Sequence, residues 1–279
     1  MIYLTGSTGY IGEKFSSYLC KMKIKHICIL KYSKNTSPNK YRTYLYFDLK
    51  KKFKLKLKFN SNDILVHLAW PSLDNYFHKD HSKEYPKSHF EFIKKLKKNN
   101  LKNIIITGTC LEYGIKNGSI KENEICNPNT EYGKGKLKLL LKLKTLKKKE
   151  NFKLNWLRLF YIYSEYPKKN TLLNELLKKT KKNKFFVVNK PNEIRDFIDI
   201  KKIVKIIFRL TKNFKDYGVI NVGSGKPKKI KIIVKKFIEK KKIDNKKIIM
   251  NKNNNKDELK FENKAFWADT TKLKRILNV

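Results

Sequence analysis

The sequence predicts an α/β fold with a doubly wound parallel sheet, and three observations predict it. A glycine-rich stretch near the N-terminus lies between a short apolar run and a segment of helical period, so its glycines stand where a strand turns into a helix. Short apolar runs that suit buried parallel strands recur along the chain. Segments of helical length separate the well-spaced runs, and this alternation is typical of a sheet covered by helices on both faces.

The elements follow from these runs in order. Strands are expected at residues 2–4, 26–30, 64–68, 103–106 and 156–161. Helices are expected at residues 13–21, 84–98 and 132–149. Beyond about residue 163, a lysine-rich helix at 172–182 and a strand at 185–188 precede a mixed remainder. We therefore expect a main domain at residues 1–164 and a smaller, substrate-binding lobe at 165–279, with some strands returning to the main sheet.

The glycine-rich stretch, residues 5–12, has the spacing of a phosphate-binding turn. Gly6, Gly9 and Gly12 would supply a tight turn, close approach of the backbone to a pyrophosphate, and close packing of helix on strand. The helix that follows Tyr10 and Ile11 offers free N–H groups and the positive end of its dipole to the phosphates. The stretch therefore predicts a dinucleotide-binding site.

The end of the second expected strand bears on which dinucleotide binds. A unit that prefers NAD usually carries an acidic residue there for the ribose 2′-hydroxyl. Here the acid is missing, and Lys31 and Lys34 stand in its place. Two lysines suit a 2′-phosphate, so we expect NADP, with NAD as the open alternative.

Tyr132 and Lys136 lie one turn apart on the same face of an expected helix. A nearby ammonium stabilises a phenolate, so Lys136 is expected to lower the pKa of Tyr132 toward neutrality and make it a proton donor and acceptor. Upstream, Thr107 and Thr109 follow the fourth strand, which places hydroxyl groups at the carboxyl edge of the sheet, where ligands bind in such folds. Together these residues predict carbonyl–alcohol interconversion.

With these motifs in order, nearly the whole chain resembles an extended short-chain dehydrogenase/reductase of the NAD-dependent epimerase/dehydratase family, which acts on nucleotide sugars. Further matches to the family's landmarks follow along the chain: Asp48-Leu49, His67-Leu68-Ala69, Tyr113-Gly114, Arg158-Leu159-Phe160, Arg195-Asp196-Phe197, Asn221 to Gly225 and Asp269 to Lys272. The resemblance implies a Rossmann fold for residues 1–164.

The resemblance also implies roles for individual residues. Thr109, Tyr132 and Lys136 match the catalytic residues. The expected cofactor contacts are Gly6, Gly9, Tyr10, Ile11, Gly12, Lys31, Asp48, Leu49, Leu68, Ala69, Trp70, Thr107 and Lys136. The expected substrate contacts are Thr109, Glu112, Tyr161 and Arg195, of which Arg195 would grip a diphosphate with its bidentate guanidinium.

Departures from the family pattern narrow the activity. Dehydratases of the family carry Asp-Glu after the catalytic Thr, and Cys110-Leu111 stand there instead, which disfavours 4,6-dehydration. Residues 109–114 and 265–269 look most like reductases of 4-keto-6-deoxy nucleotide sugars. The resemblance then implies that NADPH reduces C4 of the ketosugar, that Tyr132 donates the proton, and that Lys136 and Thr109 assist.

Two alternatives stay open. A C4-epimerase would keep NAD bound and return the hydride to the other face of the sugar. A non-catalytic relative would sense the cofactor or bind nucleic acid, which the net charge of +43 invites. Only five of the 67 basic residues are Arg, however, and the lysines are spread along the chain, so we expect solvated lysine faces and no nucleic-acid partner.

The remaining expectations concern partners and surroundings. Four cysteines without paired spacing, no room for a signal peptide and no apolar run of membrane-spanning length predict a cytoplasmic protein without a membrane partner. His78, His81 and His89 are expected in a polar loop rather than at a metal site. Two leucine stripes on the helix after Tyr132, one with Leu137, Leu140 and Leu141 and the other with Leu139, Leu143 and Leu146, predict a paired-helix homodimer.

Overall fold

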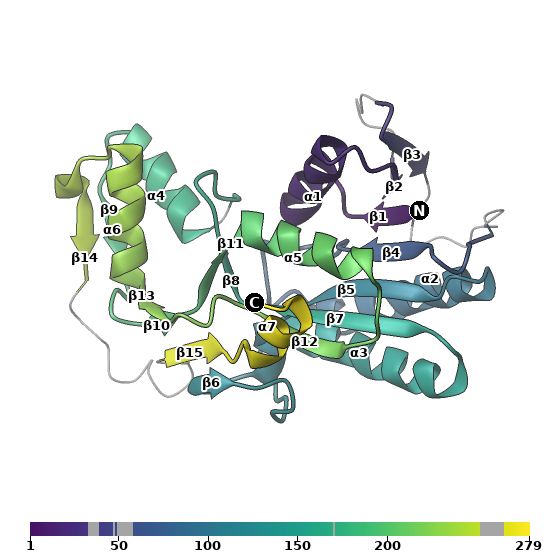
Figure 1. Cartoon of the computed structure of the whole chain (residues 1–279). Coiled ribbons are helices and arrows are strands. Elements are labelled where there is room, and N and C mark those ends of the chain that lie inside the picture. The colour runs from purple at the N-terminus through teal and green to yellow at the C-terminus, as the bar shows by residue number, and fades with distance from the viewer. Residues whose placement is uncertain (33–38, 47, 49–57, 170, 252–264) are drawn as a thin grey trace.

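The main lobe of the protein is built on one parallel sheet (Figure 1). The computed structural model describes residues 1–32, 39–46, 48, 58–169, 171–251 and 265–279. Seven strands in this described part pair in parallel, in the order β12-β7-β5-β4-β1-β2-β3. In chain order they are β1 (Ile2–Thr5), β2 (His26–Leu30), β3 (Arg42–Tyr46), β4 (Ile64–His67), β5 (Asn103–Thr109), β7 (Lys153–Leu159) and β12 (Gly218–Val222).

Helices cover both faces of this sheet, which is why its central strands read as continuous apolar runs. On one face α1 (Tyr10–Lys21) packs beside α5 (Ile200–Lys212), and their core includes Leu4 and α7 (Thr271–Leu277). On the other face α2 (Tyr85–Lys98) packs beside α3 (Glu131–Lys149), and their core includes the neighbouring Tyr3. Side chains that alternate along a strand thus feed two separate cores. The predicted doubly wound fold is confirmed.

A smaller group of elements lies beyond the carboxyl ends of the main strands (Figure 1). It contains a four-stranded sheet in the order β13-β10-β15-β6, two strand pairs and two helices. The four strands are β6 (Gly118–Ile120), β10 (Ile194–Arg195), β13 (Lys228–Lys229) and β15 (Ala265–Ala268). The pairs are β8 (Tyr161–Tyr163) with β11 (Phe197–Asp199), and β9 (Phe186–Val188) with β14 (Ile248–Met250). The helices are α4 (Leu172–Lys181) and α6 (Ile230–Lys241), which share an apolar core with β9.

Three short 3-10 helices complete the described elements: η1 (Lys79–His81), η2 (Cys110–Tyr113) and η3 (Asn245–Lys247). The part of the chain after residue 165 divides between the two lobes. In it α5, β12 and α7 pack on the main sheet, whereas α4, β9, α6 and β14 build the smaller group. β12 forms the edge of the main sheet beside β7.

Two strand boundaries differ from the sequence prediction. β5 continues to Thr109 because residues 107–109 keep pairing with Leu157 to Leu159 of β7. The strand expected at 156–161 is divided: β7 ends at Leu159 and β8 starts at Tyr161. Between them the Phe160 N–H donates to the Val222 carbonyl, which turns the chain toward the smaller lobe.

The two predicted stripes of α3 are not arranged as expected. Leu140 is buried together with Leu139, Leu143 and Leu146 because α2 and the main sheet enclose this side of the helix. Leu141 is the leucine of the helix that stays exposed, at 53%. The apolar face on which the homodimer was predicted is therefore largely covered within the chain, and the homodimer stays a prediction.

Candidate functional site

A cavity of about 1230 Å³ opens at the carboxyl ends of β1, β4 and β5, between the main lobe and the smaller one. Carboxyl ends of parallel strands are where ligands bind in this architecture. The cavity wall brings together most of the predicted cofactor and substrate residues: Gly6, Gly9, Tyr10, Ile11, Gly12, Lys31, Asp48, Leu68, Ala69, Trp70, Thr107, Thr109, Tyr132, Lys136, Tyr161 and Arg195. Leu49 lies outside the described residues.

The glycine turn forms one end of this wall. Gly6 has a φ of +71°, and a Cβ there would stand 2.6 Å from the Ala69 nitrogen at the end of β4. A Cβ on Gly12 would stand 2.1 Å from the Gly6 carbonyl oxygen. Only glycine therefore lets the turn approach both β4 and α1 this closely. The first turn of α1, which no side chain caps at Gly9, borders the cavity with N–H groups suited to a pyrophosphate.

Lys31 borders the cavity next to β2, and it has an acidic neighbour. Its Nζ lies 3.3 Å from Oδ2 of Asp48 and 4.6 Å from the centre of the Tyr32 ring. The acid missing at the end of β2 is thus supplied from a later part of the chain. Lys34, the second predicted lysine, lies outside the described residues.

Lys136 is held in the wall by two contacts. Its Nζ donates to the Thr107 carbonyl at 2.7 Å and lies 4.0 Å from the centre of the Trp70 ring. Burial lowers the pKa of Lys136 to about 7, and the negative charge of Glu112 opposes that decrease. Near neutral pH this amine therefore exists in both protonation states.

Tyr132 stands one helical turn before Lys136, and its hydroxyl is hydrogen-bonded to the Thr109 hydroxyl. Burial raises the pKa of Tyr132 well above its ordinary value, and this hydrogen bond lowers it only in part. The expectation that Lys136 lowers the pKa of Tyr132 is wrong in this structure. The Nζ of Lys136 points to the Thr107 carbonyl, 5.9 Å from the centre of the phenol ring, and is itself desolvated.

Tyr76 is a residue of the site that the sequence interpretation missed. Its ring stacks on that of Tyr132 with centroids 5.1 Å apart, and its carbonyl accepts from the Tyr132 N–H at 2.9 Å. It borders the cavity in the segment between β4 and α2. The aromatic pair Tyr76-Phe77 was the available signal, but no spacing rule connects it to Tyr132.

The three histidines of this segment and of α2 make internal contacts. His81 accepts a hydrogen bond from the Trp70 indole at 2.9 Å and bonds to the carbonyls of Ser72 and Asn75. His89 is hydrogen-bonded to His67 at 2.7 Å. His78 caps η1 by accepting from the Asp80 N–H. Within the described part of the chain no group of such side chains could hold a metal ion.

Arg195 and Tyr161 border the opposite, smaller-lobe side of the cavity. The Arg195 guanidinium donates to Oε2 of Glu193 at 2.6 Å and lies 5.6 Å from the centre of the Tyr161 ring. Burial raises the pKa of Tyr161, while Arg195 opposes this increase. A phosphate that approached Arg195 would therefore compete with Glu193 for the same N–H groups.

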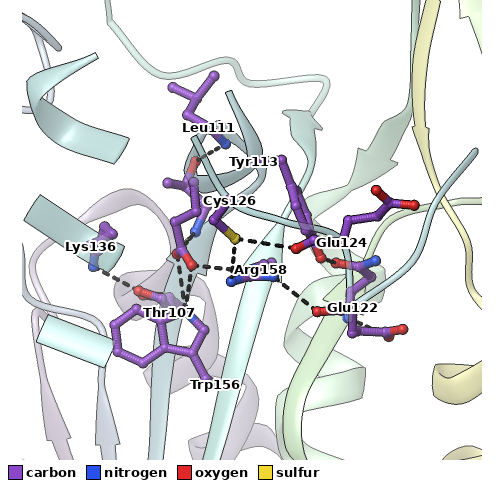
Figure 2. A network of polar contacts seen from close by, with 12 residues as sticks. Thr107, Leu111, Tyr113, Glu122, Glu124, Cys126, Lys136, Trp156 and Arg158 are labelled. Carbon is purple, nitrogen blue, oxygen red and sulfur yellow. Dashed lines mark hydrogen bonds and ion pairs between the residues drawn. The ribbon is translucent and has the colours of Figure 1, made fainter. Parts of the chain in front are cut away.

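Glu112 is the predicted substrate contact that the structure places elsewhere. Its side chain is fully buried and does not border the cavity. The carboxylate accepts from the Thr109 N–H at 2.9 Å, from the Trp156 indole at 3.0 Å and from Nε of Arg158 at 2.8 Å, within the polar network of Figure 2. The prediction that Glu112 binds substrate is corrected, because its carboxylate is engaged inside the protein.

With this geometry, comparison with known proteins gives a consistent answer. The model of the NAD dependent epimerase/dehydratase family matches residues 2–223. The chain belongs to this family. It is accordingly an enzyme, and both the predicted resemblance and the predicted enzymatic nature are confirmed.

A curated relative of this family member is dTDP-6-deoxy-L-talose 4-dehydrogenase (NAD(+)) from Aggregatibacter actinomycetemcomitans. It is 31% identical over 248 residues, which are 85% of this chain and 89% of the relative. Two solved structures have the same fold: MoeE5 in complex with UDP-glucose and NAD, and UDP-glucuronic acid 4-epimerase from Bacillus cereus in complex with UDP-glucuronic acid and NAD. Both have a TM-score of 0.78 and cover 99% of this chain and 92% of theirs, at 17% and 20% identity.

No helix of the described residues combines the length and apolar character needed to cross a bilayer. All four cysteines lie in the described part, and each is a free thiol.

Proposed function

We propose that this enzyme reduces the C4 keto group of a nucleotide-linked 4-keto-6-deoxyhexose. The observation that carries the proposal is that Thr109, Tyr132 and Lys136, which are distant in sequence, border one cavity with the glycine turn at its end. The name of the curated relative, a 4-dehydrogenase of a dTDP-linked 6-deoxysugar, supports the same carbon and the same substrate class.

The side chains suit the direction of reduction. Because burial keeps the pKa of Tyr132 high, its phenol is protonated at neutral pH and can donate to an alkoxide. The Thr109 hydroxyl, bonded to that of Tyr132, would donate to the carbonyl oxygen that becomes this alkoxide. Arg195 would bind the diphosphate of the substrate after exchanging Glu193 for a phosphate oxygen.

The wall also fits a nicotinamide dinucleotide. The turn at Gly6 to Gly12 and the start of α1 would hold the pyrophosphate, and Lys136 would hold the nicotinamide ribose. When bound, this cofactor would supply the hydride for the reduction. We propose NADP as the preferred form because Lys31 borders the adenosine end, with NAD, which the relatives' names print, as the rival.

We also propose that the enzyme works as a homodimer in the cytoplasm. The free thiols agree with a reducing compartment. The dimer would use the exposed side of α3 around Leu141.

The test is a panel of nucleotide 4-ketosugars incubated with NADPH or NADH, with the absorbance of the reduced nicotinamide followed over time. We expect oxidation of the cofactor with a 4-keto-6-deoxyhexose. Copurifying NAD without net oxidation of added cofactor would instead indicate a C4-epimerase. No turnover, with binding to random duplex DNA that survives physiological salt, would indicate the non-catalytic relative.

Tyr132→Phe is the variant that tests the proton donor. It should lower turnover at least about a hundredfold while the cofactor still binds. Tyr166→Phe is the matched control, because Tyr166 is 71% exposed and does not border the cavity. Unchanged turnover in Tyr132→Phe would remove Tyr132 from this role.

A further inference from the structure

The carboxylate of Glu112 lies directly behind the end of β5 that carries the proposed catalytic threonine. Thr109 and Glu112 form a reciprocal cap of η2: the Thr109 hydroxyl accepts from the Leu111 N–H, and the Glu112 carboxylate accepts from the Thr109 N–H. The cap orients both the backbone and the hydroxyl of Thr109 at the cavity wall. Glu112 therefore acts on a site residue without touching the cavity.

Gly108 shows how closely the carboxylate approaches β5. A Cβ on Gly108 would lie 2.4 Å from Oε1 of Glu112 and 2.1 Å from Nε1 of Trp156. Trp156 and Arg158 alternate along β7, so they project from the same face of the sheet, and both donate to Glu112. Trp156 packs in the core that α3 covers, which places the carboxylate on the α3 side of the sheet.

Lys136 approaches the same strand end from α3. Its Nζ donates to the carbonyl of Thr107, one residue before Gly108. A buried ammonium and a buried carboxylate thus flank a three-residue piece of backbone, as Figure 2 shows for Lys136, Thr107 and the network around Arg158. In a buried setting their attraction is weakly screened by solvent.

Several charged or titratable groups face this pair from the elements around it. Glu112 faces Arg158 of β7 and, within η2, Cys110 and Tyr113; Cys126 lies beside Arg158. Lys136 faces His67 of β4 and Tyr132 of its own helix. His67 is neutral near pH 7, because burial lowers its pKa to about 3. Glu112 is the acidic group that raises the pKa of Lys136 against burial.

We propose that Glu112 is a positioning residue of the site: it fixes Thr109 at the cavity wall, and its charge keeps the buried amine of Lys136 protonated. This inference rests on the proposed function for the use of Thr109 and Lys136 in turnover. The effect on the amine itself is independent of any substrate.

Glu112→Gln tests the charge while keeping the shape and an oxygen that can accept from the Thr109 N–H. The readout is trace acetylation with acetic anhydride over a series of pH values, with labelling at Lys136 measured by peptide mass spectrometry. Only the neutral amine reacts, so the midpoint reports its titration. We expect the midpoint to fall by about one pH unit in the variant. The alkaline limb of turnover should shift by the same amount, with the Michaelis constant within about twofold of the wild type.

Glu122→Gln is the matched control. Glu122 belongs to the same polar network, where it accepts from the Asn221 N–H, but it does not act on the titration of Lys136. Its labelling midpoint should equal that of the wild type. If Glu112→Gln alone fails to fold because Arg158 loses its partner, the double variant Glu112→Gln/Arg158→Gln removes both charges and should show the same downward shift.

A midpoint in either Glu112 variant that equals the wild type's, or lies above it, overturns the proposal. If the wild type turns over no ketosugar, the proposed function fails, and the labelling midpoint still decides the effect of Glu112 on Lys136.

Discussion

At the scale of single residues, the cofactor preference depends on the ion pair between Lys31 and Asp48. The Lys31 ammonium is half-exposed, so its pairing with Asp48 is weak enough to be exchanged for a stronger anion. A 2′-phosphate would be such an anion, whereas a 2′-hydroxyl would only accept or donate a hydrogen bond.

Lys31→Gln should therefore weaken NADPH binding about tenfold and leave NADH binding within about twofold. Asp48→Asn should act in the opposite direction on NADPH, because it frees Lys31. Dissociation constants from quenching of protein fluorescence would measure both, with Lys21→Gln on the exposed end of α1 as the control. Equal losses for the two cofactors would show that Lys31 does not read the 2′ position.

Lys136 leads to a prediction about stability. Its folded-state pKa of about 7 lies below the ordinary value of 10.5. Between these values the unfolded chain binds more protons, so stability rises with pH across that window, and the cost of burying the amine is fully present below about pH 7. Lys136→Met should then increase the free energy of unfolding at about pH 7 by about 1–2 kcal/mol, while abolishing turnover.

Urea denaturation at about pH 7 and about pH 9.5 would measure this, and the gain should shrink at the higher pH. Lys144→Met, on the exposed face of α3, is the control for the change of residue type. A loss of stability at both pH values would mean that the contacts of Lys136 with Thr107 and Trp70 outweigh its desolvation.

Among single residues, those carried by a local motif could be predicted and those defined by long-range packing could not. Gly6, Tyr132 and Lys136 stand in patterns whose spacing implies their place. Glu112 also stands beside a motif, but what turns its carboxylate inward is Arg158, which is 46 residues away in sequence. Tyr76 reaches the site because its segment docks on α3, and no periodicity encodes that docking.

At the scale of elements, the segment between β4 and α2 is locked onto the start of α3. The Tyr76 carbonyl accepts from the Tyr132 N–H, and Ser82 donates to Glu131. Gly135, inside α3, lets the two approach: a Cβ there would stand 1.8 Å from the His81 carbonyl oxygen. Glycine lowers helix propensity, so its presence here reflects this approach.

Gly135→Ala should consequently destabilise the protein by about 1–3 kcal/mol, although Ala favours an isolated helix by about 1 kcal/mol. The segment must move away from α3, so Tyr76 should lose its stacking on Tyr132 and turnover should fall with stability. Chemical denaturation and the steady-state rate would measure the two effects. Lys144→Ala, in the same helix without such a neighbour, should change neither; a stabilising Gly135→Ala would refute the locking role.

The elements of the main sheet were predictable because both faces of their strands are buried and apolar. The beginnings and ends were less so. β5 outlasts its apolar run because Thr107 and Thr109 find partners in β7, and short strands such as β10 and β13 exist only through tertiary pairing. The remainder after residue 188 looked mixed because its elements alternate between two lobes.

At the scale of the whole molecule, the dominant feature is a net charge of +43. Such a charge favours solubility but destabilises the compact state through self-repulsion. Surface ion pairs add little, and the lysines outnumber the acids with which they could pair. Salt should therefore stabilise this enzyme by screening, since the Debye length falls from about 30 Å at 0.01 M to about 3 Å at 1 M.

We expect the melting temperature to rise by several degrees between about 20 mM and about 500 mM NaCl, measured by differential scanning fluorimetry at constant pH. The matched variant Lys235→Glu/Lys236→Glu replaces two exposed positive charges on α6 by negative ones, so it should melt higher at low salt and gain less from added NaCl. Both changes follow only if the repulsion among the lysines outweighs the attraction within the surface ion pairs. A melting temperature that falls with salt would mean instead that the ion pairs, such as that of Lys147 with Asp216, stabilise the fold more than the surplus charge destabilises it.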